Sequence, residues 1–261
     1  MLTKNLYIEP SIKTISPKFD IEKLNHYKLL CEVSETTFAC QVIDLADGEI
    51  ISSENYEFPS DSTTIPSLRA IYETHDFLKS LKWDNIEIVI DNQFFTLIPT
   101  DLFKKEYAVK YLQLAKGDYV NPDEELHTNI HQDLGVVNIY STSRELYNWF
   151  SEVYPLVELS YKHKTSQLID FGVSSSKAQT AFLYFNNRCF TMVITVNGTL
   201  KYCNRFSYKT PQDLVYYILF VMNELGIEPD EIFLRLYGNI SEQSEEFELM
   251  NEYLPNVKIG I

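Results

Sequence analysis

The chain has 261 residues, of which 45% are hydrophobic and 14% aromatic, and its 22 basic and 37 acidic residues give a formal charge of −15. This apolar content excludes a disordered chain, and the length suits one large domain or two modest ones. The acidic balance, with a pI of about 4.7, argues against binding to nucleic acids or to anionic membranes, which requires a basic surface.

The cysteines and the apolar segments indicate the compartment. No segment reaches the roughly 20 apolar residues of a membrane span, and the N-terminal segment lacks the hydrophobic stretch of a signal peptide. Four cysteines, Cys31, Cys40, Cys189 and Cys203, lie in apolar, strand-like segments without a CxxC pair. Buried free thiols of a reducing compartment explain them best. We therefore expect a cytoplasmic protein that does not insert into a membrane.

The first half of the chain reads as strands followed by a helix. Residues 1–26, with two prolines, predict an irregular N-terminal arm. Three apolar, β-branched segments joined by short turns then predict an antiparallel meander, over residues 28–34, 37–45 and 49–58. A helix follows, with Thr63 or Thr64 as its cap, Pro66 in its first turn and apolar residues at helical spacing as far as Leu81. Ile86–Ile90 and Phe94–Ile98 predict two more strands.

The middle of the chain is less regular. It predicts a helix over 101–116, an acidic loop over 117–125, a strand over 135–141, a helix over 143–153, a strand over 156–161 and a helix over 164–177.

The second half repeats the order of the first. Residues 181–185, 189–196 and 200–208 predict three strands, with Asn186-Asn187 and Asn197-Gly198 at the turns. A helix then begins at Pro211, with Thr210 as its cap and Asp213 completing a capping box. A strand over 232–236, a helix over 242–253 capped by Ser241 and a strand over 257–261 complete the chain.

Equivalent positions in the two halves keep a nearly constant spacing. The offset is 150 residues for a turn glycine, Gly48 and Gly198. It is 146 residues for a helix cap, a helical leucine and the start of a strand: Thr64 and Thr210, Leu68 and Leu214, Ile86 and Ile232. A shared offset across different elements predicts an internal repeat of one structural unit.

This order of elements resembles the actin, Hsp70 and sugar-kinase superfamily, in which two such domains face each other across a nucleotide cleft. The chain is also similar to a bacterial family of unknown function with an actin-like ATPase fold. It resembles the pilus-assembly relatives of actin too, through a strand that ends like Phe95–Pro99.

The resemblance implies an α/β fold of two tandem actin-like (ribonuclease H-like) domains. Each would be a three-stranded antiparallel meander extended by β-α units. It places an N-terminal arm at residues 1–26, domain I at 27–161 and domain II at 162–261.

The motifs of that superfamily are degraded here. Its hairpin turns carry an Asp-x-Gly-[Ser/Thr]-like loop, in which glycine lets the backbone approach the phosphates and the acid holds Mg²⁺ through water. The matching turns read Ser34-Glu35-Thr36-Thr37, without glycine, and Asn186-Asn187-Arg188, without an acid. A Gly-Gly turn for adenosine is matched by one glycine only. By position alone, the nucleotide-binding candidates are Glu35, Thr36, Asn186, Asn187, Arg188, Gly238 and Asn239, and no residue is assigned as catalytic.

Two functions follow from this pattern. The favoured one is a non-catalytic protein-interaction or scaffold module, a pseudoenzyme without a cofactor, whose protein partner the sequence does not identify. The alternative is a nucleotide-binding ATPase or kinase that uses ATP and Mg²⁺ with substitute groups. In that alternative Glu35 or Asp44 lies near the metal, Thr36 and Asn187 at the phosphates, and Gly238 and Asn239 near the base.

A pair of histidines provides a weak metal candidate. His127 and His131 are four residues apart, so on a helix their imidazoles would share a face, as in a zinc site. The segment His-Thr-Asn-Ile-His lacks the HExxH signature. We therefore favour a polar surface segment over a metal site.

Overall fold

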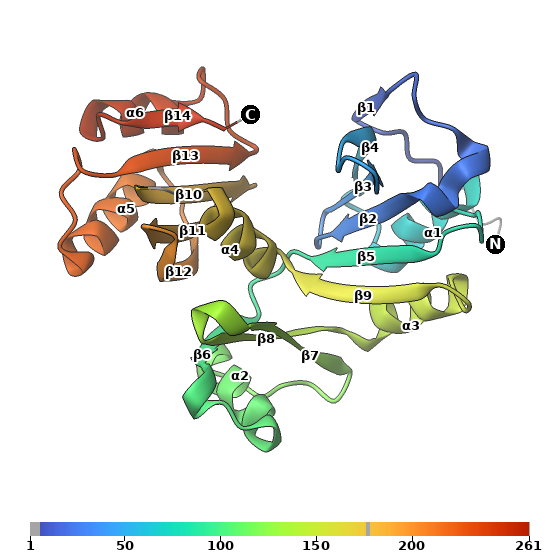
Figure 1. Cartoon of the computed structure of the whole chain (residues 1–261), viewed down its shortest axis with the longest axis horizontal. Coiled ribbons are helices and arrows are strands. Elements are labelled where there is room, and N and C mark those ends of the chain that lie inside the picture. The colour runs from blue at the N-terminus through green and yellow to red at the C-terminus, as the bar shows by residue number, and fades with distance from the viewer. Residues whose placement is uncertain (1–5, 176–177, 261) are drawn as a thin grey trace. The chain divides into compact units, whose positions relative to one another are not determined.

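The computed structural model describes residues 6–175 and 178–260, so the predicted helical residues 176–177 and the last residue of the C-terminal strand lie outside the described residues. The chain divides into two compact units, Met1–Lys164 and Thr165–Ile261, with the boundary at the start of α4 (Lys164–Ser175). Figure 1 labels the elements of both units. Over the described residues the structure is a mixed α/β fold with three sheets.

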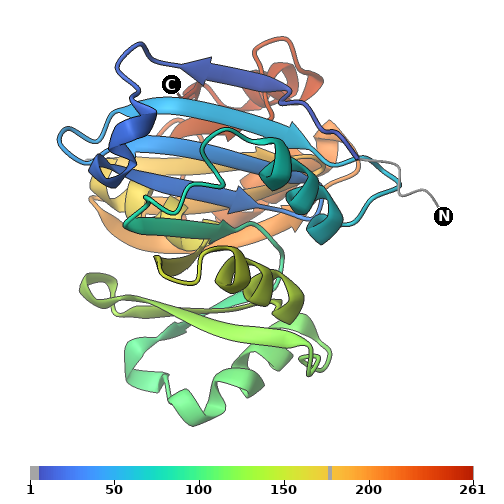
Figure 2. The ribbon, with the colours of Figure 1, turned by 90° about the vertical axis from the view of Figure 1, so that its right-hand side faces the viewer.

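Unit 1 is built on a six-stranded sheet in the order β1-β4-β3-β2-β5-β9. β2, β3 and β4 pair in antiparallel fashion, while β5 is parallel to β2 and β9 is parallel to β5. Helix α1 (Thr64–Thr74) lies against the face of this sheet that is turned toward the viewer in Figure 2, and its Leu68 and Ile71 are buried in the core. The strands are β1 (Ile12–Ile15), β2 (Tyr27–Val33), β3 (Thr37–Asp44), β4 (Ile50–Glu57), β5 (Asn85–Ile90) and β9 (Glu158–His163).

A second, smaller sheet of unit 1 lies between β5 and β9 in the chain. Its order is β6-β8-β7, and it has a core of its own formed by Leu112, Val137 and Ile139. Helix α3, which follows β8, packs against the main sheet through Trp149 and Phe150. The elements are β6 (Phe95–Pro99), α2 (Ala108–Lys116), β7 (Glu124–His131), β8 (Val136–Ser143) and α3 (Arg144–Val153).

Several expectations for unit 1 need correction. The N-terminal arm contains β1 and the 3-10 segment Ile21–His26, and Glu124–His131 forms a strand rather than the end of an acidic loop and a polar surface segment. All four residues of β1 are exposed and most of β7 is polar, so backbone pairing stabilises these strands without an apolar pattern in the sequence. The helix predicted through Leu81 ends at Thr74, and residues 101–116 form two 3-10 turns before α2.

Unit 2 contains one five-stranded sheet in the order β12-β11-β10-β13-β14. β10, β11 and β12 pair in antiparallel fashion, and β13 and β14 are added in parallel. Helix α5 (Pro211–Leu225) begins with the predicted capping box, whereas α6 (Glu245–Tyr253) is capped by Ser244, whose Oγ accepts from the N–H of Phe247, and not by Ser241. The strands are β10 (Gln179–Asn186), β11 (Cys189–Val196), β12 (Thr199–Ser207), β13 (Phe233–Gly238) and β14 (Val257–Ile259).

Candidate functional site

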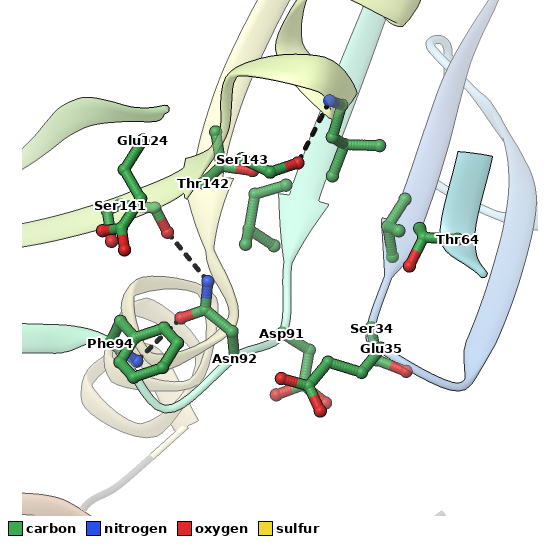
Figure 3. A pocket seen from close by; sticks show the side chains of 13 residues that line it. Ser34, Glu35, Thr64, Asp91, Asn92, Phe94, Glu124, Ser141, Thr142 and Ser143 are labelled. Atoms are coloured by element: carbon green, nitrogen blue, oxygen red, sulfur yellow. Dashed lines mark hydrogen bonds between the residues drawn. The ribbon is translucent and has the colours of Figure 1, made fainter. Parts of the chain in front are cut away.

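A pocket of about 220 Å³ lies within unit 1, where the carboxyl ends of two parallel strands meet the small sheet. Its lining comes from the ends of β2 and β5, the start of α1, the end of β8 and the start of α3. Crevices outside the carboxyl ends of strands are the usual ligand sites of α/β sheets. Figure 3 shows Glu124 and Ser141 on one side of this pocket and Glu35 and Asp91 on another.

The turn between β2 and β3 forms one wall of the pocket, and two of its backbone N–H groups already donate hydrogen bonds within the turn. The Oγ of Ser34 accepts hydrogen bonds from the N–H groups of Thr36 (3.2 Å) and Thr37 (2.9 Å). It also lies 2.6 Å from the Oγ1 of Thr37. A phosphate loop needs such N–H groups to point at the ligand. Two amides of this turn are instead used by the serine side chain.

Three carboxylates line the pocket, and no basic residue does among the described residues that form it. Glu35 is exposed on the turn, while Asp91 is only 2% exposed and follows β5, where its N–H donates to the carbonyl of Val33 (2.9 Å). Glu124 is paired with Lys116, whose Nζ lies 2.7 Å from its Oε1. Lys116 offsets the charge of Glu124, and the carboxylates of the described lining outnumber its basic residues.

Two buried oxygens lie near each other on the wall formed by the small sheet. They are the Oε2 of Glu124 and the Oγ of Ser141, a residue that is 1% exposed. Burial favours the neutral acid, but Lys116 and the nearby Ser141 hydroxyl outweigh it and lower the pKa of Glu124. The carboxylate is therefore charged at neutral pH, and the Ser141 hydroxyl stabilises this charged form.

The side chain of Asn92 connects the two walls of the pocket by hydrogen bonds. Its Nδ2 donates to the carbonyl of Ser141 (2.8 Å), and its Oδ1 accepts from the N–H of Phe94 (2.8 Å). The same Oδ1 lies 3.4 Å from the Nε2 of His163, at the end of β9. One side chain thus links the end of β5 to the small sheet and to the neighbouring edge strand.

Two opposing electrostatic effects decide whether this pocket favours an anion or a cation: the helix N-termini attract anions, and the carboxylates repel them. The starts of α1 and α3 border it, and a helix N-terminus favours an anion by about 0.3–1 kcal/mol. Two like charges about 4 Å apart repel each other by about 4 kcal/mol at an effective dielectric constant of 20. The α3 terminus is moreover capped, because the Oγ of Ser143 accepts from the N–H of Leu146 (3.1 Å). The carboxylates therefore dominate, and the pocket favours cations.

In unit 2 the structure brings together the other predicted site residues. Asn186, Asn187 and Arg188 form the β10–β11 turn, and Asn239 donates its N–H to the carbonyl of Phe185 (2.9 Å), directly before that turn. The Nη1 of Arg188 donates to the carbonyl of Lys209 (2.8 Å).

Gly238 has a structural reason to be glycine. Its φ is +83°, and a Cβ there would overlap the carbonyl oxygen of Phe185. The position therefore needs glycine whether or not a ligand binds.

The histidine pair does not form a site. His127 and His131 lie on β7, and residues four apart in an extended strand are about 13 Å apart, so the helical spacing does not apply. The His127 ring instead stacks on the rings of Tyr140 and Tyr161, with centroid distances of 5.2 Å and 5.1 Å. Burial lowers its pKa. Throughout 6–175 and 178–260, no three His, Cys, Asp or Glu side chains gather as ligands for one metal ion.

Most residues of the pocket were not singled out by the sequence. Glu35 was, through the superfamily turn, but Asp91, Asn92, Glu124 and Ser141 were not. A usable signal existed for Asp91 and Asn92, which are polar residues directly after a buried strand. Glu124 and Ser141 come from the small sheet, and β7 has no apolar pattern that predicts a strand.

The comparisons identify the family. A model of a family described as a protein of unknown function, DUF3822, matches residues 16–257. The chain belongs to this family. A search of curated proteins finds no match.

Many solved structures are similar to the chain, and two of them are informative. One is a protein of unknown function from Bacteroides thetaiotaomicron with an actin-like ATPase fold, with a TM-score of 0.81, 21% sequence identity and coverage of 93% of both chains. Another belongs to the PilM–PilN type IV pilus biogenesis complex, with a TM-score of 0.60, 10% identity and coverage of 89% of this chain and 88% of the other. The DUF3822 chain thus has an actin-like ATPase fold, as the sequence predicted. Within the two described ranges, no helix has both the length and the apolar composition that a membrane crossing requires.

Proposed function

We propose that this DUF3822 protein is a non-catalytic protein-interaction module, built from two tandem actin-like domains, that binds a protein partner at the unit 1 pocket. The main support is the structure of the β2–β3 turn. The β2–β3 turn, which binds phosphate in the actin superfamily, has no glycine, and the Ser34 hydroxyl occupies its Thr36 and Thr37 amides. The site beside it is lined by carboxylates, which repel phosphates and attract basic groups.

The order of strands supports the tandem-domain part of the proposal. In unit 1 it is β4-β3-β2-β5-β9 after the edge strand β1, and in unit 2 it is β12-β11-β10-β13-β14. Both consist of an antiparallel meander followed by two parallel strands. An ancestral actin-like domain that occurs twice accounts for this order. The PilM–PilN assembly provides a distant precedent for an actin relative that works by binding a protein.

The fold favours one alternative, an ATPase or kinase that binds ATP and Mg²⁺ through non-standard residues. In unit 1, Glu35 would lie near the metal. The other candidate, Asp44, is at the far end of β3 from the β2–β3 turn, whereas Asp91 lines the same pocket as Glu35. In unit 2, Asn187 would contact phosphates, and Gly238 and Asn239 would lie near the base. Fold alone does not fix function, because the same fold serves many activities.

Site-specific photo-crosslinking in the cells that produce the protein tests the proposal. A benzophenone amino acid replaces Thr36, which is exposed beside the pocket, or Ala46, which is exposed in the β3–β4 turn at the opposite end of the sheet. We expect a discrete crosslinked protein from position 36 that is absent from position 46. Identical patterns at the two positions, or no crosslink from either, would contradict binding at this site.

A further inference from the structure

We propose that the open edge of β12 in unit 2 binds an extended, acidic segment of another protein as an additional antiparallel strand. This edge shares no residue with the unit 1 pocket. β12 is the last strand of its sheet, at the end opposite to β14 (Figure 1). Over the described residues no strand pairs with its outer side. A strand of nine residues at such an edge offers unpaired backbone N–H and C=O groups to another chain.

The equivalent edge is closed in unit 1. β4 is the third strand of its meander, as β12 is in unit 2, and β1 pairs with the outer side of β4 in antiparallel fashion. The two edges match in detail, because the pairing register shifts directly after Val42, opposite Ser52, and directly after Ile194, opposite Tyr202. Unit 1 thus shows what this edge accepts, which is a short extended segment in antiparallel orientation.

The hydrogen bonds of the β11–β12 pair identify the backbone groups that face outward. The N–H of Tyr208, directly after β12, donates to the carbonyl of Arg188, directly before β11 (3.0 Å). In an antiparallel ladder alternate residues bond to the same neighbour. Every second residue before Tyr208 therefore bonds toward β11, and the backbone groups of Arg205 and Cys203 point to the open side.

Aromatic rings determine what one face of the added strand would contact. Tyr202 and Phe206 pack on the α5 side of β12, and Phe206 stacks on Tyr217 of α5 with a centroid distance of 5.1 Å. The rings continue onto the surface of the helix through Tyr216 and Phe220, which are 62% and 49% exposed. Aromatic and β-branched side chains pair favourably across strands. The bound segment should therefore carry apolar, β-branched residues on this face.

The charge of the edge determines the other face. Residues 199–212 contain Lys201, Arg205 and Lys209 and no acid, whereas the whole chain has a formal charge of −15. Exposed charges more than about 8 Å away are largely screened at physiological ionic strength, so the local basic residues decide. Two β12 edges from two copies would bring these basic residues together, which disfavours self-pairing. A different protein with acids on alternate residues fits the edge.

The positions of those acids follow from the ladder. Residues directly opposite each other in a sheet share a face, and successive residues alternate between faces. Residues opposite Cys203 and Arg205 therefore lie on the face away from α5, and their N–H groups point at β12. The acids belong at these positions and the apolar residues between them.

Short peptides with the full chain test the proposal. One probe is acetyl-Glu-Val-Glu-Val-Glu-amide, and the other has lysine in place of each glutamate. Binding is followed by ¹H–¹⁵N TROSY spectra. We expect the acidic peptide to shift the amides of Cys203 and Arg205, to bind at least about fivefold more tightly than the lysine peptide, and to bind more weakly as salt is added.

Backbone methylation separates strand addition from attraction between side chains alone. N-methylation of the central glutamate removes an N–H that points at β12 and should weaken binding at least about tenfold. N-methylation of one valine alters an N–H that points away and should change the affinity less than about twofold.

A matched pair of variants localises the site. Lys201→Glu reverses an exposed charge on β12, and Lys258→Glu makes the same change on β14, at the other edge of the same sheet. The two edges are four strand spacings apart, or about 19 Å at ~4.8 Å each. We expect Lys201→Glu to weaken binding of the acidic peptide at least about twofold, and Lys258→Glu to leave it unchanged.

Three results would overturn the proposal. The first is equal binding of the acidic and lysine peptides, and the second is an equal effect of the two N-methyl groups. The third is the absence of shifts at Cys203 and Arg205 with about 10 mM acidic peptide, a concentration tenfold above a Kd of ~1 mM. A crosslink from position 36 reports on the unit 1 pocket, so the function proposed there stands or falls separately.

Discussion

The turn after the first strand and the residue after the parallel strand carry two acids in unit 1 and none in unit 2. The turns have equal length, because Val33 pairs with Phe38 in one unit and Phe185 pairs with Phe190 in the other. The residue after the parallel strand donates to the equivalent carbonyl in both, from Asp91 to Val33 and from Asn239 to Phe185. Glu35 and Asp91 therefore have no acidic counterpart among Asn186, Asn187, Arg188 and Asn239.

What differs between the units is the insertion that follows. In unit 1 the chain builds β6, α2, β7, β8 and α3 between β5 and β9, whereas in unit 2 it passes from β13 through α6 to β14. Glu124 and Ser141 of the pocket belong to this insertion. The two units therefore share the backbone of this edge. The pocket arises from side chains and from an insertion that, in the described residues, occurs in unit 1 and not in unit 2.

The largest expected effect concerns Gly238, which stands where unit 1 has Ile90. Gly238→Ala should destabilise unit 2 by at least about 3 kcal/mol, because the added Cβ overlaps the Phe185 carbonyl in a left-handed backbone. Gly48→Ala is the control, since its φ is +76° with nothing within 4 Å, and should cost about 1 kcal/mol. Hydrogen exchange of the β13 amides measures the cost of Gly238→Ala, and that of the β3 and β4 amides measures the cost of Gly48→Ala. Equal losses of stability for Gly238→Ala and Gly48→Ala would contradict the close contact between Gly238 and the Phe185 carbonyl.

The second prediction concerns a buried acid on β4 of unit 1. Glu54 is 1% exposed and contacts three donors, the Tyr56 hydroxyl (2.5 Å), the His75 Nε2 (3.2 Å) and the Lys13 ammonium (3.0 Å). Burial favours the neutral acid, but these groups outweigh it and lower the pKa of Glu54 to about 2. Glu54→Gln should destabilise unit 1 by about 3 kcal/mol, as for a broken buried ion pair. Glu57→Gln, on the exposed face of the same strand, should cost less than about 0.5 kcal/mol.

The pH dependence of this acid follows from the direction of its shift. Because its pKa is lower in the folded chain, the stabilisation is complete above its ordinary pKa of 4.5 and is lost as the pH falls through about 2. The difference in unfolding free energy between wild type and Glu54→Gln should therefore shrink below pH 4.5. A difference that stays constant down to pH 2.5 would show that Glu54 does not act through its charge.

These two sites illustrate what the sequence predicts. The antiparallel strand triplets, the capping box at Thr210 and the parallel strands follow from apolar periodicity and turn residues, and the structure contains them. The caps predicted at Thr63 or Thr64 and at Ser241 are not found. Glu54 was not predicted, because a single acid within a strand pattern does not reveal that Lys13 and His75, from two other elements, converge on it. Glu124 and Ser141 were missed for a similar reason, since their meeting depends on the register of β7 and β8.

The third prediction tests the insertion of unit 1. Burial lowers the pKa of His127, which stacks on two tyrosines and has a buried Nε2 without a partner. The unfolded chain therefore binds the proton more readily, and unit 1 loses stability as the pH falls below about 6.5. His127→Phe keeps an aromatic ring and should remove this dependence between pH 6.5 and 5, with a change in stability within about 1 kcal/mol at pH 7.5. Thermal melts of wild type and His127→Phe between pH 5 and 7.5 measure this dependence. The same loss of stability on acidification in both proteins would contradict the prediction.

The smallest expected effect compares the helices that follow the two meanders. Thr210 caps α5 by accepting from the N–H of Asp213, whereas Thr63 makes no such bond at the start of α1. Thr210→Ala should cost about 1 kcal/mol and Thr63→Ala only a few tenths. Chemical unfolding of both variants measures the costs. A larger cost for Thr63→Ala would show that the start of α1, beside the pocket, is capped in solution.

Calorimetric titration of the wild-type chain with ATP, in the presence and absence of Mg²⁺, tests the central claim most directly. Because the Ser34 hydroxyl holds the turn amides and carboxylates line the neighbouring pocket, we predict no saturable heat in either condition. Stoichiometric binding of ATP that requires Mg²⁺ would contradict the account and favour an ATPase or kinase with substitute residues.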